Sequence, residues 1–419
     1  MLFLTESFDV LIVGAGPAGS TAARYASKYG LKTILLEEHA SVGLPTHCTG
    51  KLVVEAFQEF DISKKCILNQ VRGAIFLSPS NFKFAFAKDT AESYIMDRVL
   101  FDRLVAEQAE GDGAKLLTSA RVTEISKQND GYRIVKIQTK NGLQEVRTHI
   151  IIDAEGASQR LLSQLNVEGS PLFLKGLQYE LDCCNIERKD YVEVYMGKRL
   201  APGFFSWFVP VTDQRARVGI CINQDLTESS VRKLLDGFSK DHPELSHRVQ
   251  GSKILSVFGG LIPLHGIKGM TYGDGFLIIG DAAGHNKSTS GGGIYFGMKG
   301  GKMAAQTALD AVEENNFSRN LLRSYESRWK RSFGNELKFT SKARKLLDSF
   351  SDNDLDMIIN VFSKSQVLRS VVEAHGDTAR QSCLWSPMMK ALSVVGMKQP
   401  SALSVFAKMA WKAFLVSLF

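Results

Sequence analysis

The feature that most constrains this chain is the stretch from Phe8 to Gly19, in which an apolar strand leads directly into three spaced glycines. Residues 9–13 are mostly branched apolar side chains, a composition typical of a buried strand. Gly14, Gly16 and Gly19 then follow with the spacing G-x-G-x-x-G. In that arrangement the first glycine permits a tight turn, the second leaves space for a pyrophosphate, and the third lets a helix pack closely on the sheet. The stretch therefore predicts the strand, turn and helix that open a dinucleotide-binding domain.

The residues after the glycines complete a βαβ unit. A helix with a small-residue face ends at Gly30, and residues 32–36 form a second apolar strand. The N-terminal amides and the dipole of that helix are expected to point at phosphates. The strand stops at Glu37, close to the spacing at which a carboxylate accepts hydrogen bonds from the ribose of an adenosine. Glu37 therefore predicts an adenosine-containing cofactor, the alternative being a glycine-rich turn without a ligand.

Length, charge and cysteine content narrow the class of protein. A chain of 419 residues is long enough for two or three domains. Its net charge of +7 is mild and is not gathered into the long basic runs of nucleic-acid-binding proteins, so it suits an anionic ligand or membrane surface. The six cysteines form no C-x-x-C pair and no metal-ligand spacing with the histidines, so neither a metal nor an iron–sulfur site is expected.

The sequence shows the pattern of neither a signal peptide nor a transmembrane helix. Thr5, Glu6 and Asp9 interrupt the apolar start that a signal peptide needs, and no segment is long and uncharged enough for a transmembrane helix. We therefore expect a cytoplasmic protein, with peripheral membrane contact left open.

The C-terminal residues 401–419 bear on that question. Apolar residues recur there at helical spacing with two lysines between them: Leu403, Phe406, Ala410, Phe414 and Leu418, with Lys408 and Lys412, and with Trp411 and Leu415 widening the apolar surface. The segment is either an interfacial helix with snorkelling lysines or a helix that closes over the core of its own protein.

The rest of the chain alternates between helical and β-rich segments. A helix at 97–110 precedes three strands at 121–127, 132–139 and 144–152, whose turns have hairpin chemistry. We expect three domains: a discontinuous cofactor domain (1–70, 92–170 and 266–320), a β-sheet substrate domain (71–91 and 171–265) and a helical C-terminal domain (321–419).

Three distant segments are expected to meet in the cofactor domain. They are the first glycine turn, the strand end at Gly280 and Asp281, and the glycines 291–293 that precede a small-residue helix. Asp281 would lie near the ribityl and pyrophosphate groups of FAD, and the helix would point its amides at the pyrimidine end of the flavin. This set resembles the FAD-binding fold of the glutathione-reductase and p-hydroxybenzoate-hydroxylase type, an α/β fold with an added antiparallel β-layer.

Within that fold, two stretches resemble the geranylgeranyl reductase family. Residues 280–297 (GDAAGHNKSTSGGGIYFG) are similar to its second flavin motif, and residues 202–210 (PGFFSWFVP) to its substrate motif P-x-x-Y-x-W-x-F-P. Phe205 and Val209 depart from that motif, standing where the family has Tyr and Phe. The resemblance runs from about residue 8 to 305 and is loose over the last hundred residues.

The resemblance implies FAD as cofactor and a set of site residues. Implied cofactor contacts are Gly14, Gly16, Ala18, Gly19, Glu37, Cys48, Thr49, Gly50, Arg98, Val122, Asp281, Gly292, Gly293 and Ile294. Phe205 and Trp207 are implied substrate contacts, and strand alternation puts them on the face opposite Phe204 and Phe208. Arg98 resembles a helix arginine beside the cofactor, the simpler alternative being an exposed ion pair with Asp102.

Cys48 stands where the family has a cysteine near the flavin, in a loop rich in glycine and proline. A free thiol is mostly protonated at neutral pH and tolerates an apolar substrate, so Cys48 is expected to position or protonate the alkene. The alternative is that it only shapes the pocket as a small apolar residue.

The resemblance implies an FAD-dependent reductase that saturates the C=C bonds of geranylgeranyl chains in isoprenoid ether phospholipids of the archaeal type. The substrate would be an isoprenoid lipid, and an external donor (NADPH, a ferredoxin or a deazaflavin) would reduce the flavin. The main alternative is an FAD-dependent monooxygenase acting on a hydrophobic substrate, although Glu155 replaces the aspartate of the Ala-Asp-Gly sequence usual in related hydroxylases. A flavoprotein that passes electrons to a quinone and a non-catalytic lipid-binding protein are further alternatives.

Overall fold

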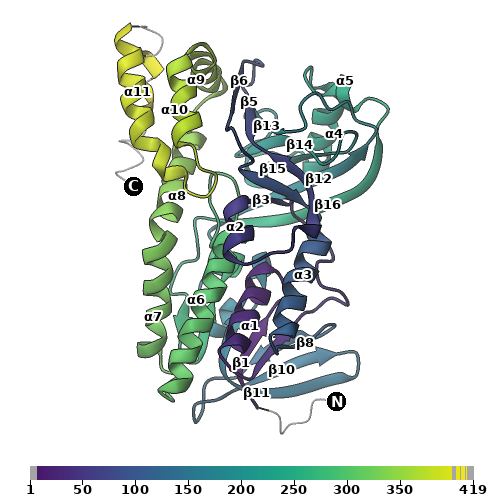
Figure 1. Cartoon of the computed structure of the whole chain (residues 1–419), viewed down its shortest axis with the longest axis vertical. Helices are drawn as coiled ribbons and strands as arrows, with labels where there is room; N and C mark the ends of the chain where they lie inside the picture. Colours follow the sequence, from purple (N-terminus) through teal and green to yellow (C-terminus); the bar gives the residue numbers. More distant parts are fainter. Residues whose placement is uncertain (1–6, 399–402, 406, 411, 413–419) are drawn as a thin grey trace. The chain divides into compact units, whose positions relative to one another are not determined.

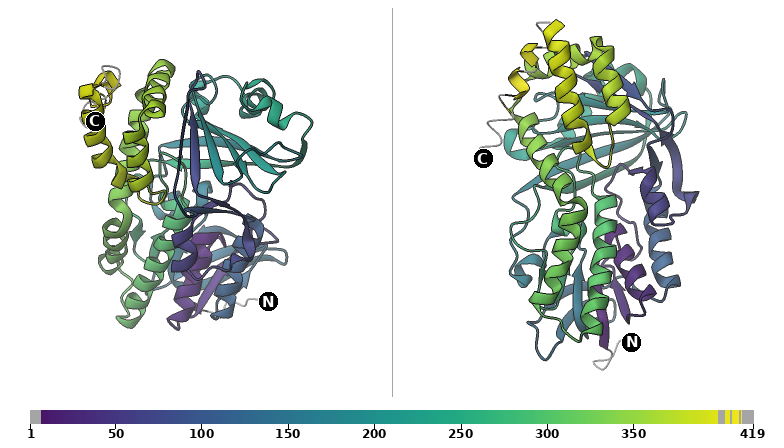
Figure 2. Two further views of the ribbon diagram at one scale, coloured as in Figure 1. Left: turned by 45° about the horizontal axis from the view of Figure 1, so that its top comes forward. Right: turned by 60° about the vertical axis from the view of Figure 1, so that its left-hand side comes forward.

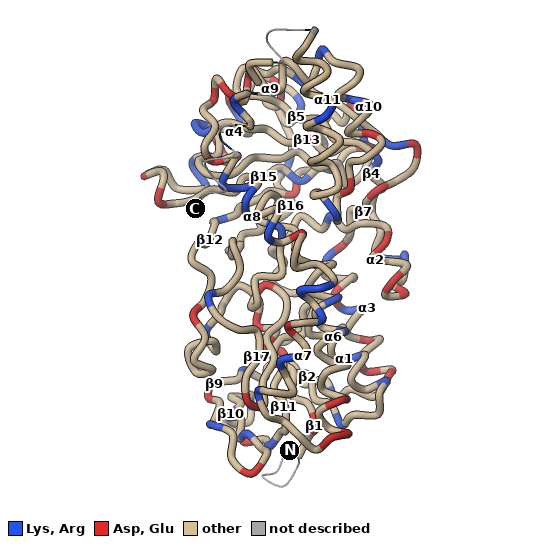
Figure 3. The backbone as a smooth tube through the Cα atoms, turned by 90° about the vertical axis from the view of Figure 1, so that its left-hand side faces the viewer, with Lys and Arg blue, Asp and Glu red and all other residues tan. Residues whose placement is uncertain are grey.

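The computed structural model describes residues 7–398, 403–405, 407–410 and 412, and the chain divides into two compact units (Figure 1). The first unit consists of segments 1–46, 98–172 and 262–338, and the second of segments 47–97, 173–261 and 339–419. Basic and acidic residues are interspersed along both (Figure 3), as expected from the mild net charge.

The first unit is built on a largely parallel sheet of order β17-β18-β11-β1-β2-β8. β1 pairs in parallel with β2 and β11, and β11 pairs in parallel with β18, so the carboxyl ends of these strands lie at one edge. β9 and β10 add the antiparallel meander that the sequence predicts. The strands are β1 (Ser7–Val13), β2 (Thr33–Leu36), β8 (Lys115–Leu117), β9 (Arg121–Ile125), β10 (Arg133–Thr139), β11 (Gly142–Asp153), β17 (Tyr272–Gly273) and β18 (Phe276–Ile278).

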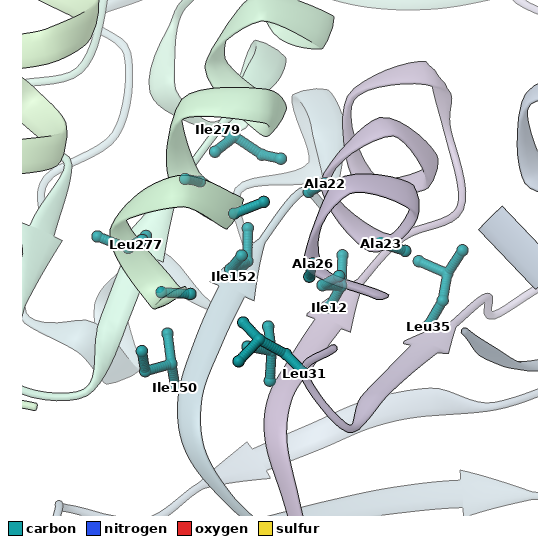
Figure 4. Close-up of a cluster of buried hydrophobic side chains, with 14 of the residues drawn as sticks. Ile12, Ala22, Ala23, Ala26, Leu31, Leu35, Ile150, Ile152, Leu277 and Ile279 are labelled. Carbon is teal, nitrogen blue, oxygen red and sulfur yellow. The ribbon is translucent and has the colours of Figure 1, made fainter. Parts of the chain in front are cut away.

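Small residues let two helices approach each other and the sheet. The helices of the unit are α1 (Pro17–Lys28), α3 (Arg98–Gly111), α6 (Ile294–Glu313) and α7 (Arg319–Trp329). α1 and α6 pack side by side, and a Cβ at Gly301 would lie 2.5 Å from the carbonyl oxygen of Ala18. Figure 4 shows the buried cluster beneath them, in which Ala22 and Ala26 face the sheet residues Ile12 and Ile152.

The second unit contains a seven-stranded, mostly antiparallel sheet of order β16-β12-β15-β14-β13-β5-β6. One face is covered by α4 (Val231–Asp241) and α5 (Ser246–Val249), over a core that includes Phe208 and Phe238. The strands are β5 (Gly73–Leu77), β6 (Lys83–Ala87), β12 (Leu172–Asp182), β13 (Tyr191–Met196), β14 (Phe205–Pro210), β15 (Ala216–Ile222) and β16 (Lys253–Leu264). A smaller sheet of β3 (Lys51–Val53), β7 (Ser93–Met96) and β4 (Ile67–Val71) accompanies the helix α2 (Val54–Glu59).

The chain ends in helices, as the sequence predicts. They are α8 (Asn335–Ser349), α9 (Asp352–Lys364), α10 (Gln366–His375) and α11 (Trp385–Lys398). α10 packs against both α9 and α11 (Figure 2), and side chains from all three surround Phe84 of β6. No helix within the described part of the chain is long and apolar enough to cross a membrane.

The described residues of the C-terminal segment bear on whether it is an interfacial helix or a helix that closes over its own protein. The ammonium groups of Lys408 and Lys412 both pair with the buried Asp354 of α9, the latter at 3.1 Å, and Val405 is fully buried. Phe406, Trp411, Phe414, Leu415 and Leu418 lie outside the described residues. For the part that is described, these contacts favour a helix held on its own protein.

The division into units differs from the domain boundaries expected from the sequence. Residues 47–70 and 92–97 belong to the second unit, because β3 and β4 both pair with β7. Residues 321–338 belong to the first, since the Tyr325 hydroxyl donates to the carbonyl of Ile278 at 2.8 Å.

Candidate active site

The three glycines of the turn differ in whether the protein's own packing requires a residue without a side chain. Gly14 has φ +96°, and a Cβ there would lie 2.5 Å from the carbonyl oxygen of Ala154. A Cβ at Gly19 would overlap the carbonyl oxygen of Gly14. Gly16, in contrast, has an ordinary φ of −69°, and none of the described atoms lies within 4 Å of its Cβ position. The protein itself requires the first and third glycines, whereas the space beside the second is free for a ligand.

This difference gives a test of cofactor binding. Gly16→Ala should leave the free energy of unfolding of the apoprotein within about 0.5 kcal/mol of the wild type, as expected for a substitution that meets no neighbour. The same methyl group should weaken FAD binding by about tenfold or more, equivalent to about 1.4 kcal/mol, because it occupies the approach of the pyrophosphate. Urea unfolding of the apoprotein and fluorescence titration with FAD measure the two quantities. Unchanged FAD affinity would show that no phosphate approaches this turn.

Glu37 lies at the carboxyl end of β2, beside the glycine turn. Its Oε2 accepts a hydrogen bond from the amide of Ala15 at 3.0 Å, and its Oε1 accepts one from the amide of His39 at 3.0 Å. The ring of His39 also contacts Oε1, at 2.6 Å. A carboxylate oxygen can accept more than one hydrogen bond, so Glu37 can hold the turn and a ribose hydroxyl together.

The three segments that were expected to converge do so within the first unit. Val13 is paired with Asp153, and Asp153 with Ile278, so the strand ends before Gly14 and Gly280 lie at the same sheet edge. A Cβ at Gly280 would lie 3.0 Å from the Ala18 methyl. The Cβ position of Gly293, which precedes α6, is 2.7 Å from Oδ1 of Asp281. Ligands in open α/β sheets bind at such an edge.

Asp281 and Arg98 provide the charges at this edge. The pKa of Asp281 is raised above its ordinary value because the carboxyl group is buried. A 3.3 Å hydrogen bond from Asn286 and the nearby charge of Arg98 offset part of this increase. Arg98 forms a bidentate ion pair with Asp102, with bonds of 3.1 and 2.9 Å. Their side chains are only 10% and 8% exposed, so the ion pair is buried, and the alternative of an exposed pair is wrong. A buried arginine whose charge reaches Asp281 suits a site for an anionic cofactor.

One buried oxygen near the edge, Oδ1 of Asn286, has no hydrogen-bond partner among the described residues. Buried polar atoms are normally paired, so this oxygen is available to a hydroxyl or amide group of a ligand. This oxygen and the free space at Gly16 are features that fit FAD. Four other residues predicted to contact the cofactor differ in exposure. Gly292, Gly293 and Ile294, at the start of α6, are at least partly exposed, whereas Val122 of β9 is buried within the apolar core.

His285 belongs to the same motif as Asp281, residues 280–297, and its ring is enclosed by aromatic rings. Trp329 and Phe333 lie 4.8 and 5.2 Å from its ring centroid, and neither ring nitrogen has a partner in the described part of the protein. Burial lowers the pKa of His285 to about 3. The imidazole is therefore neutral at physiological pH.

This histidine should make stability depend on pH. The unfolded chain takes up a proton on His285 near pH 6.5 and the folded protein only near pH 3, so stability is complete above pH 6.5 and is lost as the pH falls toward 3. At pH 5 the loss should be about 2 kcal/mol relative to pH 7.5, from 1.36 kcal/mol per pH unit. His285→Phe should remove that part of the pH dependence, which urea unfolding at both pH values measures. An equal pH dependence in wild type and variant would contradict this assignment.

The second unit holds Cys48, Thr49 and Gly50 in a loop fixed to the large sheet. Cys48 is partly exposed, and its Sγ accepts a hydrogen bond from the amide of Gly50 at 3.3 Å. The Thr49 carbonyl accepts from the buried Arg217 at 2.7 Å, and the Gly50 carbonyl accepts from the amide of Met96 at 2.8 Å. Gly50 has φ +76°, a left-handed conformation that favours glycine. The thiol therefore sits on a backbone with a defined geometry.

The predicted substrate residues lie on β14, and within this strand the predicted alternation is confirmed: Phe205 and Trp207 are partly exposed, whereas Phe208 is buried. The prediction for Phe204 is wrong, because this residue precedes the strand and its buried ring stacks on that of Phe205, with centroids 4.3 Å apart. The rings of Phe205 and Trp207 meet edge to face with centroids 6.0 Å apart. The Trp207 indole lies directly over Gly219, where a Cβ would overlap it. These two rings form an apolar wall suited to a hydrocarbon chain.

Three residues of this region were not predicted from the sequence: Gln178, Glu180 and Arg217. All are buried, and Arg217 Nε donates to Glu180 at 2.9 Å. A signal was present, because Gln178 and Glu180 alternate with Leu177, Tyr179 and Leu181 and so share one face of the strand.

Comparison with known proteins extends these observations to the whole chain. The family model for FAD dependent oxidoreductases matches residues 9–159, and that for the geranylgeranyl reductase catalytic domain matches residues 174–262. The crystal structure of a geranylgeranyl bacteriochlorophyll reductase-like protein from Thermoplasma acidophilum matches with TM-score 0.83 and 26% identity, covering 96% of this chain and 99% of that one. A flavin-dependent brominase structure, at 17% identity and TM-score 0.72 over 94% of this chain and 100% of that one, shares the fold.

The fold is thus that of an FAD-dependent oxidoreductase with mixed sheets and a helical C-terminal region, and FAD is the cofactor, as predicted. A digeranylgeranylglycerophospholipid reductase of Methanocaldococcus jannaschii is 31% identical over 372 residues, which cover 86% of this chain and 92% of that protein. Because this identity extends over most of both chains, the chain belongs to the geranylgeranyl reductase family of FAD-dependent oxidoreductases.

Proposed function

We propose that this protein saturates C=C bonds in the geranylgeranyl chains of isoprenoid ether phospholipids. The observation that carries the proposal is the match of residues 174–262 to the geranylgeranyl reductase catalytic domain, since that segment contains Trp207, Gln178 and Arg217. The similarity to relatives named digeranylgeranylglycerophospholipid reductase supports the same substrate class.

The division of labour between the units is part of the proposal. FAD, once bound and reduced, supplies the hydride that an isolated trisubstituted alkene requires. In the first unit, Gly14, Gly16 and Gly19 would receive the pyrophosphate, Glu37 the adenosine ribose, and Asp281 and Arg98 the middle of the cofactor. The start of α6, from Gly292 to Ile294, would point its amides at the pyrimidine end of the flavin. The fold would be of the glutathione-reductase and p-hydroxybenzoate-hydroxylase type.

In the second unit, Cys48 would donate the proton that completes saturation of the alkene. Its Sγ would release the proton to the alkene carbon that does not receive the hydride. The amide of Gly50, which already donates to Sγ, would stabilise the negative charge left on sulfur. Phe205 and Trp207 would bind the isoprenoid chain and exclude water from it. Thr49 and Gly50 would face the flavin. An external electron donor and peripheral action on a cytoplasmic membrane surface complete the proposal.

Product analysis separates this function from that of a monooxygenase. Enzyme reduced with dithionite under argon is incubated with a phospholipid that carries two geranylgeranyl ether chains, and the lipid is analysed by mass spectrometry. We expect products heavier by one or more pairs of hydrogen atoms. Products that appear only when air is admitted and that contain added oxygen would support a monooxygenase instead.

A further inference from the structure

Gln178, a residue to which the proposed reaction assigns no chemical step, is bonded to both parts of the candidate site in the second unit. It lies on β12 with 3% of its surface exposed. Its Oε1 accepts hydrogen bonds from the Thr49 hydroxyl at 3.0 Å and from the Trp207 indole nitrogen at 3.1 Å. Its Nε2 donates to the carbonyl of Cys48 at 3.4 Å. A single buried amide therefore joins the loop that carries the thiol to the aromatic wall.

The chemistry of the partners fixes the orientation of this amide. An indole nitrogen can only donate and a backbone carbonyl can only accept. The oxygen of Gln178 must therefore face Trp207, and its nitrogen must face Cys48. All three hydrogen bonds are satisfied together in this orientation, so the contact is specific to a side chain with one acceptor and one donor at this length.

The neighbours of Gln178 hold each part separately. Arg217 ties the loop to β7, because it donates to the carbonyl of Thr49 in the loop at 2.7 Å and to that of Met96 on β7 at 3.0 Å. The indole rests on Gly219 and packs against the ring of Phe205, and these apolar contacts provide no hydrogen bond to its nitrogen. Gln178 supplies that bond and shares it with the loop.

We infer that Gln178 is a positioning residue that sets the placement of the Cys48 thiol relative to the Trp207 wall. Its catalytic meaning rests on the proposed function, in which Cys48 delivers a proton to an alkene that lies against Trp207. Small misplacements of reacting groups lower rates steeply. The amide thus links where the chain binds to where the proton is delivered.

Two substitutions divide the contributions of the amide. Gln178→Met is similar in shape and removes all three hydrogen bonds. It should lower kcat by about tenfold or more and raise KM for the lipid several-fold, because neither the loop that carries the thiol nor the Trp207 indole is then held by a hydrogen bond to residue 178. Gln178→Glu keeps an acceptor for Thr49 and Trp207 and loses the donor to Cys48. It should lower kcat while KM stays near the wild-type value.

A matched control is available in the same unit. Gln224 donates to the carbonyls of Thr227 and Ser229, at 2.9 and 3.2 Å, in the turn that follows β15. Gln224→Met removes two hydrogen bonds of a glutamine and should leave kcat and KM unchanged. A general loss of stability would act similarly in both methionine variants, whereas the split between kcat and KM in Gln178→Glu requires a role in positioning.

A readout that does not depend on turnover tests the same inference. The alkylation of Cys48 by iodoacetamide is followed by peptide mass spectrometry, with the exposed Cys383 as internal reference. Gln178→Met should change the Cys48 rate by about threefold or more relative to Cys383, because thiol reactivity follows its surroundings and access. Thr49→Val, which removes one of the three bonds, should change it in the same direction and serves if the methionine variant does not fold.

The outcomes distinguish this inference from the proposed function. If the wild type does not reduce the lipid, the proposed function fails, and the alkylation rates alone decide the role of Gln178. If the wild type is active, a folded Gln178→Met protein with wild-type kcat, KM and Cys48 alkylation overturns the inference. Changed alkylation together with the split between kcat and KM in Gln178→Glu supports it.

Discussion

Cys48→Ala should retain bound, reducible FAD and reduce the geranylgeranyl lipid about 10²-fold more slowly than the wild type, the usual range for loss of a general acid. The physical reason is the position of the thiol. It is partly exposed on a loop held at Thr49 and Gly50, and the Gly50 amide already donates to its sulfur. The rate is measured by lipid mass spectrometry after single turnovers of pre-reduced enzyme.

Cys48→Ser and Cys383→Ala provide the controls. A serine hydroxyl is a much weaker acid than a thiol, so Cys48→Ser should be nearly as slow as Cys48→Ala. Cys383 is an exposed free cysteine in the C-terminal helical region, and its alanine variant should keep the wild-type rate. A near-wild-type rate for Cys48→Ala would mean that water or another group supplies the proton and that Cys48 only fills space.

Glu37→Arg should weaken FAD binding by about 1–3 kcal/mol, the usual cost of losing hydrogen bonds to a charged group. The substitution removes the acceptor of the Ala15 amide within the glycine turn and places a cation where the adenosine ribose is expected. The dissociation constant is measured by flavin fluorescence during titration of the apoprotein.

Glu38→Gln is the matched control for this change. Glu38 is the next residue, but its carboxylate forms ion pairs with Arg121 and Arg160, at 2.8 and 2.9 Å. Its neutral variant should bind FAD as the wild type does. An unchanged affinity in Glu37→Arg, or FMN as the flavin extracted from the protein, would contradict the assignment of the N-terminal motif.

Local patterns were enough to predict much of the fold. The strands predicted at 121–127, 132–139 and 144–152 occur close to those bounds as β9, β10 and β11, because alternation and turn chemistry act between residues close in sequence. The long edge strand β16 was not predicted. Gly259 and Gly260 interrupt its pattern, yet they fit there because a Cβ would crowd Leu177 and His47, at 3.2 and 3.0 Å.

The candidate site was predicted in part for a related reason. The glycine turn and the residues around Asp281 are written in contiguous motifs, so they could be recognised before their convergence was seen. Gln178 is separated in sequence from Cys48 by 130 positions and from Thr49 by 129. No local pattern encodes a contact over such a distance. The spacing of Arg98 and Asp102 predicts an ion pair but contains no information on its burial.

Anaerobic stopped-flow spectroscopy tests the central claim most directly. Enzyme photoreduced under argon is mixed with the digeranylgeranyl phospholipid, and the absorbance of oxidised flavin near its visible maximum is followed without any oxygen. The account predicts that this absorbance returns in step with the addition of one pair of hydrogen atoms to the lipid per flavin. A flavin that stays reduced in the presence of the lipid and is reoxidised only when oxygen is admitted would contradict it.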